Sequence, residues 1–287
     1  MSGQQVPTHV TLTHTSSSTF ANLKVINGQV SQSLNHNLTV CIHAAYFGNV
    51  PTPSQLIEFI EMYRLLGADK FVSYNAARKT GLEHIERYYR GQDLLDIYNW
   101  DLPTNIDAFY YAQHSLVQDC IYRYMYSSKF IALVNVDEFI LPRIHSNLLG
   151  MLNDLSRRNV GQYLFQNKFF PLNLPNTNEV IRHKNNRILQ STLLNHVMKE
   201  DKDWGYNHHS KTVVNPRSVE IGEIHNMRKM RHGATTCRVS PQKAVMQHYR
   251  EWNVRDDVPI VVDVTARRFL YQLEMRLSKA YHKIYIK

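Results

Sequence analysis

Five apolar residues near the middle of the chain run directly into polar and acidic side chains. The run at 130–134 predicts a strand buried on both faces, and Asn135, Asp137 and Glu138 follow it at its carboxyl end. A carboxylate is costly to bury unless it is paired or bound to a cation, and open α/β sheets place their ligands at the carboxyl ends of their strands. Two interpretations stay open from this segment alone. Either Asp137 holds a divalent cation that bridges to a phosphate, or Asp137 and Glu138 only cap the strand.

The spacing of Asn135 and Asp137 suits a shared ligand. In an extended segment, side chains two residues apart point to the same face, so one can reach a cation and the other a sugar or a water. Magnesium and manganese sites that bind diphosphates need few protein ligands, because the phosphate oxygens supply the rest. His225 and His248 stand at strand-like positions later in the chain, and either can complete such a site. A lone histidine is more often a surface or packed residue, so the sequence does not choose between them.

A second group of polar residues has the composition of a sugar-handling site. Glu200, Asp203 and Trp204 lie in a polar segment just before Gly205. An aromatic ring can pack on the apolar face of a sugar while a carboxylate binds or deprotonates one of its hydroxyls. The same composition also fits a solvated acidic loop, so this segment does not establish a site by itself.

Composition restricts the partners. The chain has 287 residues, enough for one large domain or two small ones, and a net charge of +9. That charge favours anionic ligands such as nucleotides, or an anionic membrane surface, although it also serves solubility. Lys and Arg form no long run, so we expect no nucleic-acid partner. The sequence shows neither an apolar stretch long enough for a transmembrane helix nor a signal-peptide pattern.

The three cysteines, Cys41, Cys120 and Cys237, have a spacing typical of no metal motif, and their odd number leaves at least one unpaired. Cys41 and Cys120 each lie among apolar residues. We therefore expect both to be core residues rather than metal ligands or members of a disulfide framework.

The elements that must position these residues follow from hydrophobic periodicity. Residues 1–37 are polar and weakly periodic, which predicts a mobile leader, with one strand near 23–26, before a single ordered domain at 38–287. Ser54 and Ser146 are the predicted caps of the first and fourth helices. We expect strands at 38–45, 70–74, 94–98, 130–134, 162–166 and 211–215, and helices at 55–66, 82–90, 109–127, 147–155 and 265–287. The alternation of strands and helices predicts an α/β fold with a mostly parallel central sheet flanked by helices.

Several segments together resemble glycosyltransferase family 92 in their order and spacing. The longest joins QDCIYRYMY, which starts at Gln118, to VDEF, which starts at Val136, and it is far more specific than a short acidic motif. The resemblance extends from residue 38 to the C-terminus. The segments are 38–42 (LTVCI), 55–75, 110–143, 209–227 and 244–252.

The resemblance implies a GT-A fold, an α/β sandwich that binds a nucleotide sugar beside a metal-binding acidic motif. It implies a Mn²⁺-dependent, inverting hexosyltransferase that moves galactose from UDP-galactose to a glycan acceptor. It also implies a Golgi or secretory-pathway membrane location on the lumenal side, through an N-terminal anchor that this chain lacks. The alternative is a catalytically weakened or silent relative that acts as a nucleotide-sugar or glycan-binding module.

The resemblance also implies roles for individual residues. Asp137 matches the second acid of the family's Asp-x-Asp motif, and His225 matches the expected additional metal ligand. Glu200 and Asp203 are the candidates for the catalytic base. Predicted contacts to the nucleotide or its diphosphate come from Tyr74, Asn75 and Arg250. Gln113 and Asp119 either line the nucleotide pocket or brace it.

Asn135 departs from the family pattern, which usually has aspartate there. The neutral amide halves the formal charge of the motif. We expect Asn135 to contact the nucleotide sugar while Asp137 and the diphosphate still hold the metal, so that activity is retained.

Overall fold

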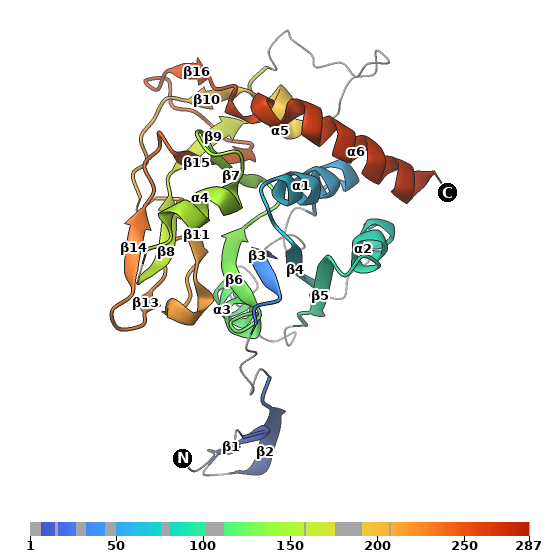
Figure 1. Ribbon diagram of the computed structural model, residues 1–287, viewed down its shortest axis with the longest axis vertical. Coiled ribbons are helices and arrows are strands. Elements are labelled where there is room, and N and C mark those ends of the chain that lie inside the picture. The colour runs from blue at the N-terminus through green and yellow to red at the C-terminus, as the bar shows by residue number, and fades with distance from the viewer. Residues whose placement is uncertain are drawn as a thin grey trace.

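The structure, a computed structural model, describes residues 7–14, 17–26, 33–43, 50–75, 81–101, 112–157, 159–175, 191–206 and 208–286. Its centre is a seven-stranded sheet with the strand order β14-β8-β11-β6-β3-β4-β5 (Figure 1). The strands are β3 (His36–Ile42), β4 (Lys70–Asn75), β5 (Leu95–Asn99), β6 (Ser128–Val134), β8 (Val160–Phe165), β11 (Lys211–Val214) and β14 (Thr235–Arg238). Neighbouring strands are parallel except on either side of β11, which is antiparallel to both β6 and β8. The predicted α/β class with a mostly parallel sheet is therefore confirmed.

The central strands are buried on both faces, as their continuous apolar runs predict. In β6, Phe130, Ala132 and Val134 face one hydrophobic cluster, while Ile131 and Leu133 face another. The first cluster includes residues of α1, α2, α4 and α6, and the second includes residues of α3, so helices cover both sides of the sheet (Figure 1). The helices are α1 (Pro53–Leu65), α2 (Glu83–Arg90), α3 (Gln113–Arg123), α4 (Leu148–Leu155), α5 (Thr192–Asn195) and α6 (Leu270–Tyr285).

Both predicted helix caps were misplaced, the first too late in the chain and the second one residue too early. Thr52, not Ser54, caps α1: its side chain accepts from the backbone N–H of Gln55, whose side chain accepts in return from the backbone of Thr52. Asn147, not Ser146, caps α4 by accepting from the backbone N–H of Gly150 at 2.7 Å. Helix α3 stops at Arg123, four residues before the predicted end of the helix at 109–127. The first residues of that prediction, 109–111, fall outside the described residues.

A three-stranded sheet lies beside the central one, in the order β7-β15-β9. Its strands are β7 (Glu138–Pro142), β15 (Ala244–Arg250) and β9 (Asn167–Pro171). Strand β7 starts only four residues after β6 ends, so the chain leaves the central sheet within the acidic segment itself. That change of sheet places Asp137 and Glu138 at a junction between two sheets.

The remaining elements are short. Two-stranded pairs form between β10 (Met198–Glu200) and β16 (Ile260–Val262), and between β12 (Val219–Ile221) and β13 (Lys229–Met230). Short 3₁₀ helices occur at Pro216–Ser218 and at Thr265–Phe269, the latter leading into α6. Within the predicted polar leader, β1 (His9–His14) pairs with β2 (Ser17–Lys24) in a hairpin that lies apart from the main body (Figure 1).

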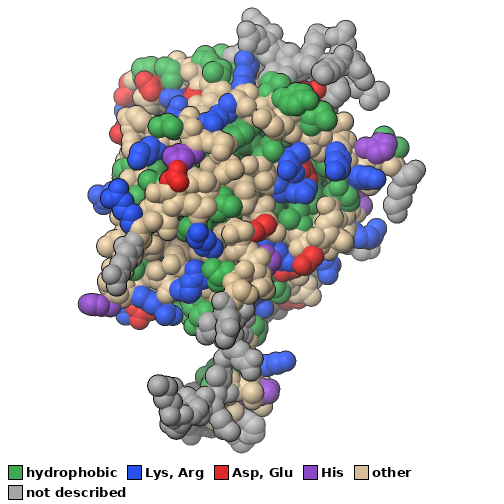
Figure 2. Space-filling view, in the orientation of Figure 1, with side chains coloured by type: hydrophobic (Ala, Val, Ile, Leu, Met, Phe, Trp, Pro, Cys, Tyr) green, Lys and Arg blue, Asp and Glu red, His purple; other side chains and the backbone are tan. Residues whose placement is uncertain are grey.

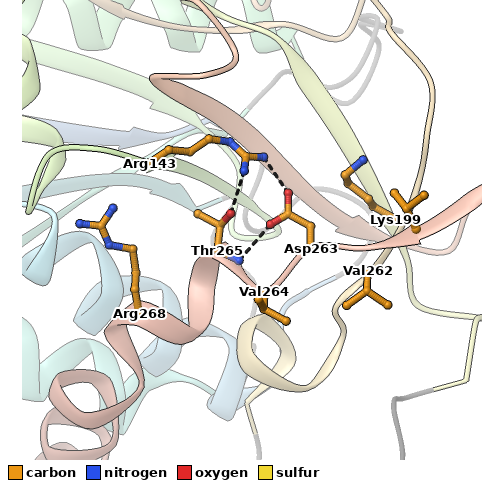
Figure 3. A pocket seen from close by; sticks show the side chains of 8 residues that line it. Arg143, Lys199, Val262, Asp263, Val264, Thr265 and Arg268 are labelled. Carbon is orange, nitrogen blue, oxygen red and sulfur yellow. Dashed lines mark hydrogen bonds and ion pairs between the residues drawn. The ribbon is translucent and has the colours of Figure 1, made fainter.

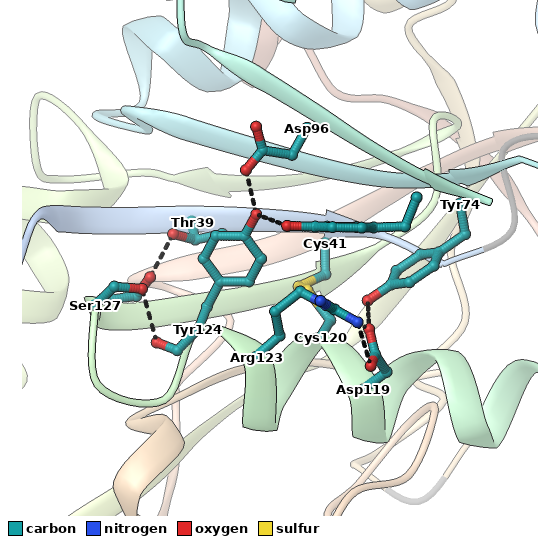
Figure 4. Close-up of a disulfide and its surroundings, with 11 residues drawn as sticks. Thr39, Cys41, Tyr74, Asp96, Asp119, Cys120, Arg123, Tyr124 and Ser127 are labelled. Atoms are coloured by element: carbon teal, nitrogen blue, oxygen red, sulfur yellow. Dashed lines mark hydrogen bonds and ion pairs between the residues drawn. A yellow bond between two sulfur atoms is a disulfide. The ribbon is translucent and has the colours of Figure 1, made fainter. Parts of the chain in front are cut away.

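Cys41 of β3 and Cys120 of α3 form a disulfide, with Cα atoms 6.4 Å apart (Figure 4). The expectation that the cysteines form no disulfide was therefore wrong. Both residues are buried, as predicted, but the spacing in the sequence does not reveal that α3 packs directly against β3. Cys237 is free and half-buried.

The visible surface is mixed in charge. Figure 2 shows Lys and Arg side chains spread across this face among acidic and neutral ones rather than gathered in one patch. Among the residues that the structure describes, no helix combines the length and the hydrophobicity needed to cross a membrane.

Candidate functional site

The carboxyl ends of three parallel strands meet at one edge of the central sheet. Ile42 of β3 pairs with Val134 of β6 on one side and with Ser73 of β4 on the other. His43 and Asn135, which directly follow β3 and β6, are therefore neighbours at this edge. Because β11 runs the opposite way, it begins where the others end, and its first residue, Lys211, lies at the same edge.

Asp137, Glu138 and His248 form a cluster with the spacing of a metal site. Glu138 pairs with His248 across β7 and β15. The Nε2 atom of His248 lies 3.2 Å from Asp137 Oδ2 and 3.8 Å from Glu138 Oε1. One ligand atom from each residue lies within 4.8 Å of the other two. The structure thus brings together two carboxylates and an imidazole that are more than a hundred residues apart in sequence.

Glu138 is held in place by its surroundings. Its side chain is 2% exposed, and its Oε2 atom accepts from the backbone N–H of Asn135 at 2.7 Å and lies 3.2 Å from Lys211 Nζ. Burial by itself raises the pKa of this carboxyl, but the attraction of Lys211 and then of His248 outweighs burial and lowers the pKa below its ordinary value. Glu138 is therefore ionised, and Lys211 offsets its charge.

A chain of buried polar groups continues from Lys211 away from the carboxylates. Lys211 Nζ lies 3.4 Å from His43 Nε2, and His43 Nδ1 lies 2.5 Å from Gln113 Nε2. Burial, followed by the charge of Lys211, holds the pKa of His43 well below its usual value, so this imidazole is neutral. Gln113 lies at the far end of this chain, and of the two roles predicted for it, lining the pocket or bracing it, this contact favours bracing.

The cluster fits a divalent cation. Asp137 is the most accessible of the three residues, with 39% of its side chain exposed, whereas His248 is 7% exposed. Burial raises the pKa of the Asp137 carboxyl, but the hydrogen bond and attraction of His248 more than offset this, so the pKa is lowered and a carboxylate is available. Carboxylate oxygen with one imidazole nitrogen is a donor set that Mn²⁺ accepts. The Oδ1 atom of Asn135 is also buried and has no hydrogen-bond partner among the described residues, so it is a further oxygen without a protein donor.

His225 does not belong to this cluster. Its Nδ1 atom lies 3.0 Å from the carbonyl oxygen of Ser210, and its ring centroid lies 6.0 Å from that of His209. Burial, and then the charge of Lys211, lowers the pKa of His225. The metal role predicted for His225 stays a prediction, and the geometry favours His248, which the sequence left as an equal alternative.

The two predicted bases differ in their surroundings. Glu200 is 2% exposed, and its two carboxylate oxygens accept hydrogen bonds from the indole N–H groups of Trp204 and Trp252. Asp203 is exposed, and its Oδ1 atom accepts from the backbone N–H of Gly205 at 2.8 Å. Glu200 therefore orders two aromatic rings, while Asp203 remains accessible to a substrate.

Tyr74 and Asp119 lie on the α3 side of the sheet, away from the acidic cluster. Figure 4 shows the Tyr74 hydroxyl donating to Asp119, at 2.7 Å, while Arg123 donates to both oxygens of the same carboxylate. This network lies beside the Cys41–Cys120 disulfide and joins α3 to the sheet. Of the two roles that the sequence left open for Asp119, lining the pocket or bracing it, the contacts favour bracing.

Asn75 and Arg250 have different positions. Asn75 ends β4 and is half-buried at the carboxyl edge of the sheet, where a nucleotide would lie. The segments that follow β3, β4 and β5, at 44–49, 76–80 and 102–111, fall outside the described residues. Arg250 is exposed at the end of β15, with its guanidinium carbon 6.0 Å from the centre of the Trp252 ring. Neither residue belongs to the acidic cluster.

Lys211 and His43 were not singled out from the sequence. Lys211 is a lone basic residue at the head of an otherwise uncharged strand, and His43 directly follows a buried strand. Both patterns are signals of a polar edge. They were missed because the sequence does not show that β11 runs antiparallel and so brings its first residue to that edge.

A separate pocket of about 570 Å³ lies at the other end of β7 (Figure 3). Its lining includes Arg143, Asp263, Thr265, Arg268 and Lys199. Arg143 donates to Asp263 and Thr265, and Arg268 donates to backbone carbonyl oxygens. These basic groups therefore support the turn into α6, and the acidic cluster remains the better candidate for chemistry.

Two comparisons identify relatives of the chain. It is 27% identical over 117 residues to the beta-1,4-galactosyltransferase galt-1 of Caenorhabditis elegans. That match covers 40% of this chain and 27% of the length of the relative. The profile of glycosyltransferase family 92 matches residues 36–283, which includes both sheets and every residue of the acidic cluster. The protein belongs to glycosyltransferase family 92.

Proposed function

We propose that this protein is a metal-dependent, inverting glycosyltransferase of GT-A fold that transfers galactose from UDP-galactose to a glycan acceptor. The observation that carries the proposal is the cluster of Asp137, Glu138 and His248 at the carboxyl edge of a mostly parallel sheet. Ligands of open α/β sheets bind at this edge. Membership of a glycosyltransferase family supports the reaction class, and the similarity to a galactosyltransferase supports galactose as the sugar.

In this proposal Asp137 and His248 hold the cation, with Glu138 beside them. A bound Mn²⁺ would supply positive charge to stabilise the departing diphosphate. Asn135 faces the nucleotide sugar, and Asn75 lies where the nucleotide rests. Lys211 balances the charge of Glu138, so Asp137, Glu138 and Lys211 together keep a net charge of −1. That residual charge favours cation binding.

The transfer itself is a single displacement. An acceptor hydroxyl oxygen attacks the anomeric carbon, the bond from that carbon to the diphosphate oxygen breaks, and UDP leaves with the electron pair. The hydroxyl proton goes to a carboxylate, for which we propose Asp203, because Glu200 is buried and occupied by two indole donors. One displacement inverts the configuration at the anomeric carbon.

A UDP titration with and without Mn²⁺ tests the site. Wild-type protein is expected to bind UDP in a Mn²⁺-dependent way, and Asp137→Ala is expected to abolish that dependence. Asp154→Ala, which removes an exposed carboxylate of α4, is the matched control and is expected to bind like the wild type. Equal UDP affinity in Asp137→Ala and wild type would show that the metal site is misassigned.

One observation favours a silent, nucleotide-sugar or glycan-binding relative as the second candidate. Asn135 supplies no charge where the family pattern usually has an acid. A catalytically silent protein would bind UDP-galactose in Mn²⁺ without transferring or hydrolysing it. A screen of UDP-galactose against a panel of glycan acceptors separates the two candidates.

We also propose that residues 38–287 form one catalytic domain after a polar leader, and that it works in the lumen of the secretory pathway, in the Golgi. The Cys41–Cys120 disulfide supports a lumenal location, because disulfides persist in oxidising compartments and are rare in the cytosol. Immunofluorescence of the tagged protein, with marker proteins for the Golgi and the endoplasmic reticulum, tests this.

A further inference from the structure

The second sheet aligns the candidate metal site with a group of aromatic rings. In β15, His248 pairs with Glu138 of β7 on one side and with Phe169 of β9 on the other. The ring centroids of His248 and Phe169 are 5.1 Å apart. A row of three side chains thus leads from the acidic cluster directly to an aromatic group.

Two tryptophans surround Phe169. The Trp252 ring stacks on it with a centroid distance of 4.0 Å and an angle of 11° between the rings. Trp204 meets Phe169 edge-on at 5.5 Å, and it meets Trp252 at 5.9 Å in the same way. Phe169 is fully buried, whereas both tryptophans are only half-buried. The group therefore has a packed base and two rings that reach solvent.

Glu200 fixes both tryptophans. They lie in different loops, one after β10 and the other after β15, and the single buried carboxylate accepts a hydrogen bond from each indole N–H. Burying a carboxylate is costly unless it is well bonded. Core packing alone would not require a buried carboxylate here, because the Phe169 ring already fills the buried base of the aromatic group. The cost is explained if the exposed edges of the rings must be held in one orientation.

The two rings are not equivalent toward a ligand. Lys202 Nζ lies 3.7 Å from the centre of the Trp204 ring, so a cation covers one face of that ring. Trp252 has one face on Phe169, and the Arg250 guanidinium carbon lies 6.0 Å from its centre. Trp252 is therefore the ring better able to carry a flat ligand, with Trp204 as a wall beside it.

We propose that Trp252 and Trp204 form the subsite for the acceptor sugar, a pyranose with one apolar face, and that Glu200 is a positioning residue that orients both rings. This proposal rests on the glycosyltransferase function proposed above. The nucleotide edge belongs to β3 and β4 of the central sheet, whereas the aromatic group follows the acidic cluster across β7, β15 and β9 of the second sheet. The proposal therefore assigns the nucleotide to one sheet and the acceptor to the other, with the acidic cluster at their junction. Asp203, one residue before Trp204, lies in the same loop.

Intrinsic fluorescence tests the subsite, because the chain has three tryptophans and Trp100 lies elsewhere, against Tyr74. The probes are the methyl glycosides of galactose, N-acetylglucosamine, mannose and fucose, titrated into the Trp100→Phe variant in the presence of Mn²⁺ and UDP. At least one glycoside is expected to change the emission saturably. In a Trp100→Phe, Trp252→Leu variant, we expect the affinity for that glycoside to fall about tenfold or more.

A folding check and one further variant keep the test decisive. Trp252→Leu retains an apolar contact with Phe169, so folding, checked by thermal unfolding, is expected to persist. Glu200→Gln retains the volume of the side chain but loses its charge, and it is expected to weaken glycoside binding while the Mn²⁺-dependent affinity for UDP changes less than twofold. A purely structural role of Glu200 would instead lower the melting temperature and change both affinities together.

The outcomes separate this proposal from the function on which it rests. If wild-type protein shows no Mn²⁺-dependent UDP binding, the proposed function fails. If UDP binds but no glycoside changes the emission, or if Trp252→Leu keeps the glycoside affinity, the subsite is refuted while the function stands. If the substitutions weaken UDP-galactose binding and leave glycoside binding intact, the rings serve the donor, and the proposal is equally overturned.

Discussion

Lys211 determines the electrostatics of the candidate site at the scale of single residues. Its side chain is 2% exposed, and its ammonium group lies between a buried carboxylate and a neutral imidazole. A buried ion pair contributes little net stability, but removing one partner leaves an uncompensated charge in the interior. The pair therefore makes the charge of Glu138 tolerable in the fold.

Lys211→Met is expected to reduce the free energy of unfolding by about 3 kcal/mol, because it leaves Glu138 buried without its cation. Urea unfolding followed by circular dichroism measures this. The double variant Lys211→Met, Glu138→Gln is expected to recover much of the loss, since the uncompensated charge is then absent. Strictly additive losses in the double variant would show that the two groups do not stabilise each other.

Asn135 leaves the acidic motif with less charge than the family pattern provides. Asn135→Asp is expected to strengthen Mn²⁺-dependent binding of UDP by about tenfold, because a second carboxylate then faces the cation. Isothermal titration of UDP at fixed Mn²⁺ measures the change. Asn153→Asp, which adds the same charge on an exposed part of α4, is the control and is expected to have no effect. Unchanged affinity in Asn135→Asp would show that residue 135 does not contact the metal or its diphosphate.

At the scale of elements, Glu58 of α1 ties a short helix to the core. Its carboxylate accepts from the Ser191 hydroxyl and from the backbone N–H of Thr192 at 3.0 Å, at the start of α5. Burial raises the pKa of Glu58 from 4.5 to about 7, although these hydrogen bonds oppose the shift. The folded protein therefore holds this proton at pH values where the unfolded chain has released it.

Stability is expected to fall as the pH rises from about 4.5 to about 7, because the unfolded state ionises Glu58 first, and to change little from this cause above that range. The effect has an upper limit of about 3 kcal/mol. In Glu58→Gln, whose side chain cannot ionise, this contribution to the fall of stability with pH is expected to disappear. Thermal unfolding of both proteins across the range measures it, and an identical slope in the two would contradict the assignment to Glu58.

The elements that the sequence predicts best are those with local signals. The strands at 130–134 and 70–74 and the helix at 55–66 appear almost where the hydrophobic period places them. Strand β7 was missed because its apolar run is short and is separated from β6 by only three residues. The choice of His248 over His225 depends on which strand pairs with β7, a non-local property that no spacing in the sequence records. The same limit explains why the Cys41–Cys120 bond was not expected.

At the scale of the whole molecule, the disulfide joins two layers of the fold. Cys41 and Cys120 are 79 residues apart in sequence and connect the central strand β3 to α3. The double variant Cys41→Ala, Cys120→Ala is expected to lower the free energy of unfolding by about 2 to 4 kcal/mol, chiefly because the unfolded chain regains the freedom of a long loop. Guanidinium unfolding measures this, with Cys237→Ala as the control for a cysteine that forms no bond. Equal stability of the double variant and the wild type would show that the bond does not form in the folded protein.

The same bond also has a consequence for the order in which a nascent chain acquires its structure. Strands β4 and β5 and helix α2 all lie between the two cysteines, whereas β6, the other neighbour of β3, is synthesised only after Cys120. If the disulfide forms during translation, it closes a loop that contains β4, β5 and α2 before β6, which leads into the acidic segment, has been synthesised. In that case β6 adds to a preformed template of β3, β4 and β5, and the candidate site at its carboxyl end is completed only afterwards.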